Sequence, residues 1–288
     1  MSVKSVDFTK NRAVVASSFS PRALALLNEA QPFLACLSLS PVIVHAGEPS
    51  AENRERMAKM IEESRFAGAA DLELVMRNGA AEEVLLQAAR EYRADFIVAG
   101  VLPREGFFKY YLGSVGRNLA RQAPCSVLLH INPADEPVGF RKIHHAVEYH
   151  RSIDTGVDLA AKLAVLNGAR DLYFTHAFRI PDSVLKKNKV MTPEDYKKIY
   201  GREDRKLQQY LSKQLTWDVP YHVQSLYERD NSPSLAFARD IGADLFVIHA
   251  PKKEPGLWDR LFPNDLEQTL HDLPCSILIA RSRVSRRR

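Results

Sequence analysis

Short apolar runs alternate with amphipathic or polar segments along the first half of the chain. The apolar runs have the length and composition of buried parallel strands, and they lie at 12–16, 41–46, 72–76, 95–99 and 126–130. The segments between them have helical periodicity or helical length, and they cover 21–33, 51–66, 81–91 and the residues after 113. This alternation with short connections predicts a parallel sheet that carries helices on both faces.

The same alternation returns in the second half. The corresponding strands are predicted at 142–148, 171–177, 221–226, 243–248 and 276–279, with helices at 154–166, 192–215 and 233–241. Pro124-Cys125-Ser126 and Pro274-Cys275-Ser276 match, and a polar, proline-bounded stretch at 132–137 separates the halves. These repeats predict a duplicated α/β domain. We expect two doubly wound parallel-sheet domains, at 1–135 and 138–288.

Several helix boundaries carry local signals. Ser20 is predicted as the N-cap of the first helix, with Pro21 at its first position. Thr192-Pro193 is a strong helix start, and Asn167-Gly168 is a typical helix end. Gly113-Ser114 is predicted to open the helix that precedes the strand at 126–130.

Composition narrows the class of protein. Of the 288 residues, 45% are hydrophobic and 26% charged, values typical of soluble globular proteins. The apolar runs are far shorter than a membrane span and the N-terminus lacks a signal-peptide core, so we expect a cytoplasmic protein without a membrane span. Cys125 and Cys275 are expected to be small buried residues. The arginines at the C-terminus have no interleaved aromatic residues, which disfavours a nucleic-acid partner.

A loop pattern and two longer stretches resemble the universal stress protein family. Gly100, Pro103, Gly113 and Ser114 follow the spacing of the family's G-x2-G-x9-G-[ST] loop, with Pro103 in place of one glycine. The stretches NGAAEEVLLQAA (78–89) and APCSVLLH (123–130) are also similar. The resemblance covers the chain twice. It implies a tandem-type member with nucleotide-binding α-hydrolase-like, Rossmann-like domains and a binding or regulatory role in stress response, without established catalysis.

The resemblance also implies a nucleotide site in the first half. In nucleotide-binding members an Asp ends the first strand, and Ser18 takes its place here; the position that contacts adenine falls on Ala46. The phosphate loop corresponds to Gly100, Pro103, Gly113, Ser114 and Val115. Because the acid is absent and Pro103 lacks an N–H, structural retention of the loop is favoured. An ATP- or AMP-binding protein with slow ATP hydrolysis is the alternative.

Polar residues gather at predicted strand ends in the second half. Glu148 stands at the position of the family's Asp, and either His249 or Ala250 stands at its first glycine. Because the carboxyl ends of these strands converge, the predicted ligand set consists of Glu148, His150, His176 and His249. Imidazoles with a carboxylate suit zinc or a related metal, so a metal or small-ligand sensor is a second alternative. His176 matches His45, however, which favours a structural role, and the metal stays open.

Other features limit the function and the assembly. The chain has no G-x-S-x-G, G-x-x-x-x-G-K-[ST] or H-E-x-x-H motif. The sequence therefore predicts no catalytic residue and favours a role other than catalysis. The strands at 126–130 and 276–280 are expected at sheet edges, which invite pairing. Family members dimerise through this strand, so the resemblance implies an internal pseudo-dimer and leaves room for a homodimer.

Overall fold

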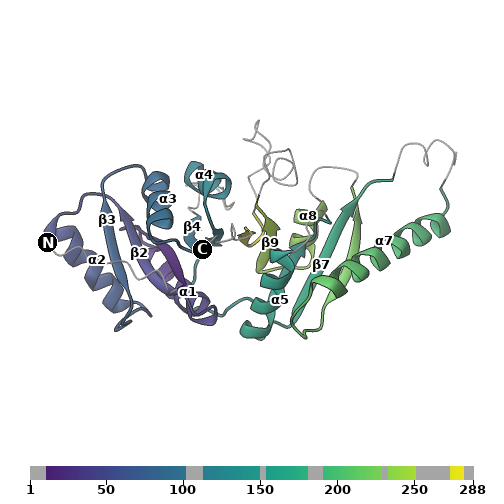
Figure 1. Cartoon of the computed structure of the whole chain (residues 1–288), viewed down its shortest axis with the longest axis horizontal. Helices are drawn as coiled ribbons and strands as arrows, with labels where there is room; N and C mark the ends of the chain where they lie inside the picture. The colour runs from purple at the N-terminus through teal and green to yellow at the C-terminus, as the bar shows by residue number, and fades with distance from the viewer. Residues whose placement is uncertain are drawn as a thin grey trace, which may run out of the picture. The chain divides into compact units, whose positions relative to one another are not determined.

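The chain consists of two compact units. The computed structural model describes residues 11–101, 113–149, 154–180, 191–228, 233–250 and 273–281. The first unit comprises Met1–Gly139 with Leu270–Arg288, and the second comprises Phe140–Thr269. Both units are built from parallel strands and the helices between them (Figure 1).

The first unit has five parallel strands, in the order β3-β2-β1-β4-β5. The strands are β1 (Arg12–Ser17), β2 (Ser40–Ala46), β3 (Glu73–Arg77), β4 (Phe96–Val101) and β5 (Ser126–Ile131). A further strand, β10 (Ser276–Ala280), pairs with β5 in the antiparallel direction. The helices are α1 (Ala23–Cys36), α2 (Ala51–Glu63), α3 (Ala81–Glu91) and α4 (Ser114–Gln122). The strand order reverses between β1 and β4, which is where ligands bind in such sheets.

The core of the first unit lies along its central strands. Val14, Ile43, Ile97 and Leu128 are completely buried, as is Met57 of α2. Strands with both faces buried read as continuous apolar runs, and this explains why the sequence predicted them well.

The second unit repeats this strand order. Its sheet runs β8-β7-β6-β9, all parallel. The strands are β6 (Lys142–Ala146), β7 (Asp171–Phe178), β8 (His222–Tyr227) and β9 (Leu245–His249), and the helices are α5 (Thr155–Asn167), α7 (Pro193–Gln214) and α8 (Pro233–Asp240). The prediction of a doubly wound α/β fold is confirmed.

Two equivalent histidines show which residues of the two units correspond to each other. Nδ1 of His45 donates to the carbonyl of Ser17 at 3.0 Å, and Nδ1 of His176 donates to the carbonyl of Val147 at 2.9 Å. Ser17 and Val147 therefore occupy the same place, and so do Val15 and His145 two residues earlier.

The sheet register extends this equivalence to the fourth strand of each unit. Val15 pairs with Val98 on β4, and His145 pairs with Val247 on β9. Two residues further on, Gly100 and His249 are equivalent. The choice between His249 and Ala250 is thereby decided for His249.

Most predicted helix signals are confirmed, and one is wrong. Thr192 and Asp195 form a reciprocal capping box at the start of α7, and Gly168 closes α5 in the left-handed conformation at φ +58°. Gly113 is the N-cap of α4. The first helix, however, begins at Ala23 rather than at Pro21.

A local turn explains the late start of α1. The Ser18 hydroxyl accepts from the Ser20 N–H, and the Ser20 carbonyl accepts from the Ala23 N–H at 3.0 Å. Ser20 is thus used in a turn before the helix, a common competition for serine.

The expectation for the cysteines is also confirmed. Cys125 and Cys275 are buried, and none of the three cysteines forms a disulfide. No helix among the described residues is long and apolar enough to cross a bilayer.

Candidate functional site

The predicted nucleotide residues of the first unit lie around its switch point. Ser18 follows β1, Ala46 ends β2 and Gly100 lies within β4. Ser18 and Gly100 are exposed, and Ala46 is half-buried. Gly113, Ser114 and Val115 form the N-cap and first turn of α4, and Pro103 lies outside the described residues.

The start of α4 presents backbone N–H groups without a side-chain cap among the described residues. Gly113 makes no side-chain cap, since it has no side chain, and no described residue lies within 4 Å of where its Cβ would be. The first N–H groups of a helix have no intrahelical acceptor and form its positive end. Ser114 is exposed beside them.

A positively charged hollow adjoins the end of β1. Its volume is about 300 Å³, and it is lined by Phe19, Ser20, Pro21, Leu24, Arg56, Lys59, Met60 and Glu63. The Arg56 guanidinium lies 4.1 Å from the centre of the Phe19 ring, whose centre is 4.6 Å from that of His45. The polar groups here are the Ser20 hydroxyl, two cations and the Glu63 carboxylate, which lies 3.9 Å from Lys59 Nζ.

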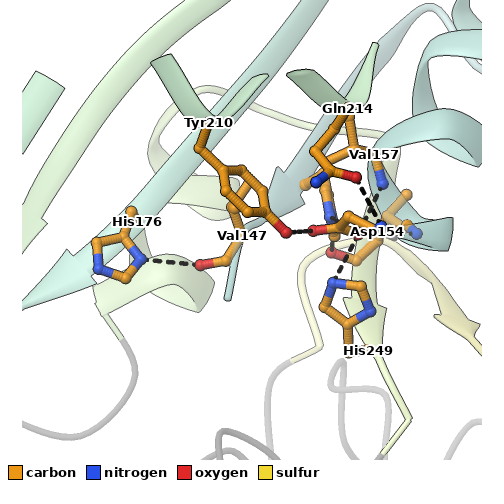
Figure 2. A network of polar contacts seen from close by, with 10 residues as sticks. Val147, Asp154, Val157, His176, Tyr210, Gln214 and His249 are labelled. Atoms are coloured by element: carbon orange, nitrogen blue, oxygen red, sulfur yellow. Dashed lines mark hydrogen bonds and ion pairs between the residues drawn. The ribbon is translucent and has the colours of Figure 1, made fainter. Parts of the chain in front are cut away.

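The second unit contains a buried cluster of two imidazoles and one carboxylate. His145 comes from β6. Asp154 is the N-cap of α5, and His249 ends β9 (Figure 2). Their relative exposures are 0%, 1% and 4%. His249 Nε2 lies 2.9 Å from Asp154 Oδ1, and His145 Nε2 lies 3.6 Å from the same oxygen. One ligand atom from each residue falls within 4.8 Å of the other two.

Asp154 is held by two helices. Its Oδ1 accepts from the N–H groups of Gly156 and Val157 at 3.0 Å, which caps α5. The Tyr210 hydroxyl of α7 donates to Oδ2 at 3.1 Å, and the Asp154 N–H donates to the Gln214 side chain at 2.9 Å (Figure 2). These contacts fix the carboxylate at one position beside the histidines.

The charge of Asp154 depends on the two imidazoles. Burial alone would raise the pKa of this carboxyl, because desolvation disfavours the charged form. The close approach of the two imidazoles and the positive charge that they can carry outweigh burial and lower the pKa of Asp154 below its ordinary value. The site therefore favours the negatively charged form of Asp154.

His145 has a fixed orientation. Its Nδ1 lies 2.9 Å from the carbonyl of Val247 and must donate there, so Nε2 faces Asp154. At 3.6 Å this atom is beyond hydrogen-bond distance, and it has no hydrogen-bond partner among the described residues. A Cβ on Gly156 would lie 2.6 Å from His145 Cε1, so the glycine makes room for the ring.

The residues predicted as ligands in the second half mostly lie elsewhere. Of the four, His249 belongs to the buried cluster, and His150 lies outside the described residues. His176 donates to Val147 and stacks on Tyr149 with ring centres 3.8 Å apart. Glu148 is half-buried and does not belong to the cluster.

The sequence analysis missed His145 and Asp154 as members of a site. The neighbouring His144 does not belong to the cluster, and its Nε2 lies 2.8 Å from Thr175 Oγ1. The missed signal was the register that places His145 beside the strand ending in His249, with Asp154 at the following helix start.

One family model matches part of the first unit. The model described as "Universal stress protein family" matches residues 24–130, which lie in the first unit. No curated protein matches the chain. Residues 24–130 therefore form a universal stress protein domain.

Solved structures share the fold over nearly the whole chain. A putative universal stress protein from Pseudomonas aeruginosa UCBPP-PA14 is 19% identical, covers 95% of this chain and 94% of its own, and has a TM-score of 0.65. A functionally unknown protein from Pseudomonas aeruginosa PAO1 is 18% identical, with 95% of this chain and 93% of that chain covered and a TM-score of 0.65. A universal stress protein from Archaeoglobus fulgidus DSM 4304 is 13% identical, with 95% of this chain and 99% of that chain covered and a TM-score of 0.59. At these identities the likeness concerns the fold.

Proposed function

We propose that the chain is a tandem-type universal stress protein that acts in stress response by binding a ligand or partner rather than by catalysis. The observation that carries this proposal is that the second unit repeats the architecture of the first unit, which contains the family match. Residues 24–130 match the family, and the second unit has the same strand order and the same histidine-to-carbonyl hydrogen bond. We take 1–135 and 138–288 as its two domains.

We infer that the two domains are joined through their fifth strands as an internal pseudo-dimer. β10, the last strand of the second repeat, lies antiparallel on β5, with Leu278 opposite its equivalent Leu128. The Ile131 N–H donates to the Ser276 hydroxyl, and the Arg281 N–H donates to the Ser126 hydroxyl. This reciprocity is the pattern of an isologous, two-fold contact.

For the ligand we infer an adenine nucleotide, ATP or AMP, in the first domain. Its support is the position of Ser18, Ala46 and Gly100 at the switch point and the uncapped start of α4, where phosphate can be bound by backbone N–H groups. Arg56 adds positive charge at the neighbouring hollow, where Lys59 lies beside Glu63. Ser18 offers a hydroxyl where a carboxylate would help hold a metal-bound triphosphate, so we expect binding without efficient hydrolysis.

Calorimetry with ATP and with AMP tests this nucleotide proposal. We expect a saturable site on the unmodified chain that Gly113→Asp abolishes, because a carboxylate at the N-cap repels phosphate. The substitution preserves the helix, since Asp is a favoured N-cap.

The matched control places the same residue at another helix start of the domain. Ala80 is the N-cap of α3 and makes no side-chain cap, so Ala80→Asp should leave nucleotide binding unchanged. No binding heat at millimolar nucleotide, or equal binding by Gly113→Asp, would contradict the site.

A further inference from the structure

We propose that His145, Asp154 and His249 bind one divalent transition-metal ion of the zinc class in the second unit. The ligand atoms would be Nε2 of both histidines and Oδ1 of Asp154. This site contains none of the residues of the nucleotide site proposed in the first unit, so it goes beyond the function proposed above. It also uses a different set of residues from the one predicted from the sequence.

The geometry is that of a nearly assembled site. Tetrahedral zinc takes imidazole nitrogens and carboxylate oxygens at about 2.0–2.2 Å, which places neighbouring ligand atoms a little over 3 Å apart. The two measured separations from Asp154 Oδ1, 2.9 and 3.6 Å, lie on either side of that spacing. The ring centres of His145 and His249 are 5.1 Å apart, with the planes at 73°. Small side-chain adjustments would complete three ligands.

The surrounding contacts also match a metal site. A ligating histidine usually donates its other ring N–H to a carbonyl or carboxylate, which fixes the ring. His145 donates its Nδ1–H to the carbonyl of Val247. The Tyr210 hydroxyl likewise fixes the carboxylate by donating to Asp154 Oδ2. Gly156 leaves the space that the His145 ring occupies.

The unsatisfied atom of His145 is the strongest single observation. Neutral His145 carries its proton on Nδ1, so a buried lone pair on Nε2 faces the Asp154 carboxylate. Burying an unpaired polar atom is costly. Either a proton on Nε2 or a bound cation removes that cost, and a divalent cation also engages His249 and the carboxylate charge.

Comparison of the two units shows how such a site can arise. His249 occupies the position of Gly100, and His145 occupies that of Val15. The second unit therefore has imidazoles at the strand positions where the first has a phosphate-loop glycine and an apolar core residue. These two replacements supply imidazole nitrogens, which suit a metal ion, where the first unit has a glycine that suits phosphate and an apolar side chain.

Zinc titration of the full chain tests the proposal. The chain is freed of metal with a chelator, dialysed, and titrated with Zn²⁺ alone in a calorimeter; bound zinc is then measured by elemental analysis. We expect one zinc ion per chain and no heat with Mg²⁺, which prefers oxygen ligands. Failure to retain zinc would overturn the site, whatever the result with nucleotide.

Variants assign the ion to its ligands. His145→Ala and His249→Ala should each weaken zinc binding at least about tenfold, since even outer-shell changes cost about 10–100-fold. Asp154→Asn removes the charge but retains an N-cap residue, and it should also weaken binding. The matched control is His222→Ala, which removes an exposed histidine 3.7 Å from Asp171 and should change nothing.

A measurement on the unmodified chain guards against variants that fail to fold. Co²⁺ in a four- or five-coordinate nitrogen–oxygen site absorbs visible light far more strongly than hydrated Co²⁺, and Zn²⁺ should displace it. A spectrum identical to that of hydrated Co²⁺ would overturn the proposal. So would nitrogen NMR showing His145 doubly protonated at neutral pH in the presence of zinc, because the proton then occupies the ligand position.

Discussion

At the scale of single residues, the partner of each ring nitrogen decides what a histidine does here. His45 and His176 donate to equivalent carbonyls and so have a structural role in their units. His145 also donates to a carbonyl, but its second nitrogen faces a buried carboxylate. Histidine thus stabilises the ends of neighbouring strands in one place and is a candidate metal ligand in another.

His144 provides a prediction about the pH dependence of stability. It is fully buried, and burial, with a smaller effect from the neighbouring His145, lowers its pKa to about 3. Below pH ~6.5 the unfolded chain takes up a proton that the folded chain does not. Stability is therefore lost as the pH falls from about 6.5 toward 3, by up to about 1.4 kcal/mol per pH unit for this group.

Replacing His144 isolates its share of that slope. Gln at this position does not titrate and retains a hydrogen-bonding amide for Thr175. Urea unfolding between pH 4 and 7 should show a lower stability for His144→Gln at neutral pH but a shallower decline on acidification. His222→Gln, an exposed control, should keep the original slope. An unchanged slope in His144→Gln would show that His144 does not enter the folded state neutral.

Local sequence signals predicted some residue roles and not others. The equivalence of His45 and His176 could be predicted because both occupy the same place in repeated strands. The membership of Asp154 could not, because it depends on a helix start meeting two strands that lie about one hundred residues apart in the chain. The membership of His145 could not be predicted either, because it depends on the pairing of β6 with β9.

At the scale of elements, helix ends followed their signals wherever the capping atoms had no competing partner. Thr192 and Asp195 cap each other, and Gly168 takes the left-handed conformation that ends α5. Ser20 did not cap α1, because it takes part in a turn with Ser18 and Ala23. The residue types at 20–23 predict that a helix begins there, whereas the hydrogen bonds of the neighbouring serines determine at which residue it begins.

Two glycines give opposite predictions for the same substitution. Gly168 has φ +58°, and no atom crowds its Cβ position, since the nearest is Arg141 Nη1 at 3.7 Å. Gly168→Ala should therefore cost about 1 kcal/mol through backbone strain alone. Gly201 lies inside α7 with only the flexible end of Arg205 nearby. Gly201→Ala should raise stability by roughly 0.5–1 kcal/mol.

Chemical unfolding of both variants beside the parent chain measures the pair. The two substitutions add the same methyl group, so a difference in sign reports backbone conformation. Equal effects of the two substitutions would contradict the assignment of Gly168 as a left-handed helix end.

At the scale of the molecule, the duplicated architecture was predictable and the chemistry of each copy was not. Strands with both faces buried and a repeat of half the chain length are visible in the sequence. The change from Gly100 to His249 is visible too, although only the register decides that these positions correspond. A repeated fold therefore predicts where a site lies, while its ligand depends on contacts across strands.

The pairing of β5 with β10 yields a prediction for the first domain alone. Residues 1–139 without 270–288 would leave the apolar edge of β5 uncovered, and such edges pair with one another. Leu128 lies opposite Leu278, its own equivalent, so two copies of β5 can pair about the same local two-fold. We expect the isolated fragment to be a folded dimer in light scattering coupled to size exclusion.

Competition with the missing strand tests whether that edge mediates the dimer. A peptide of residues 273–281 supplies β10 with the hydroxyl of Ser276 and the N–H of Arg281, which both bond to the β5 strand. Excess peptide should convert the dimer into a one-to-one complex. The same peptide with Leu278→Lys should not, because it would bury an ammonium against Leu128, whose side chain is completely buried in the full chain. A fragment that is folded but monomeric without peptide, or a dimer that both peptides leave intact, would show that β5 is not the edge through which the domains associate.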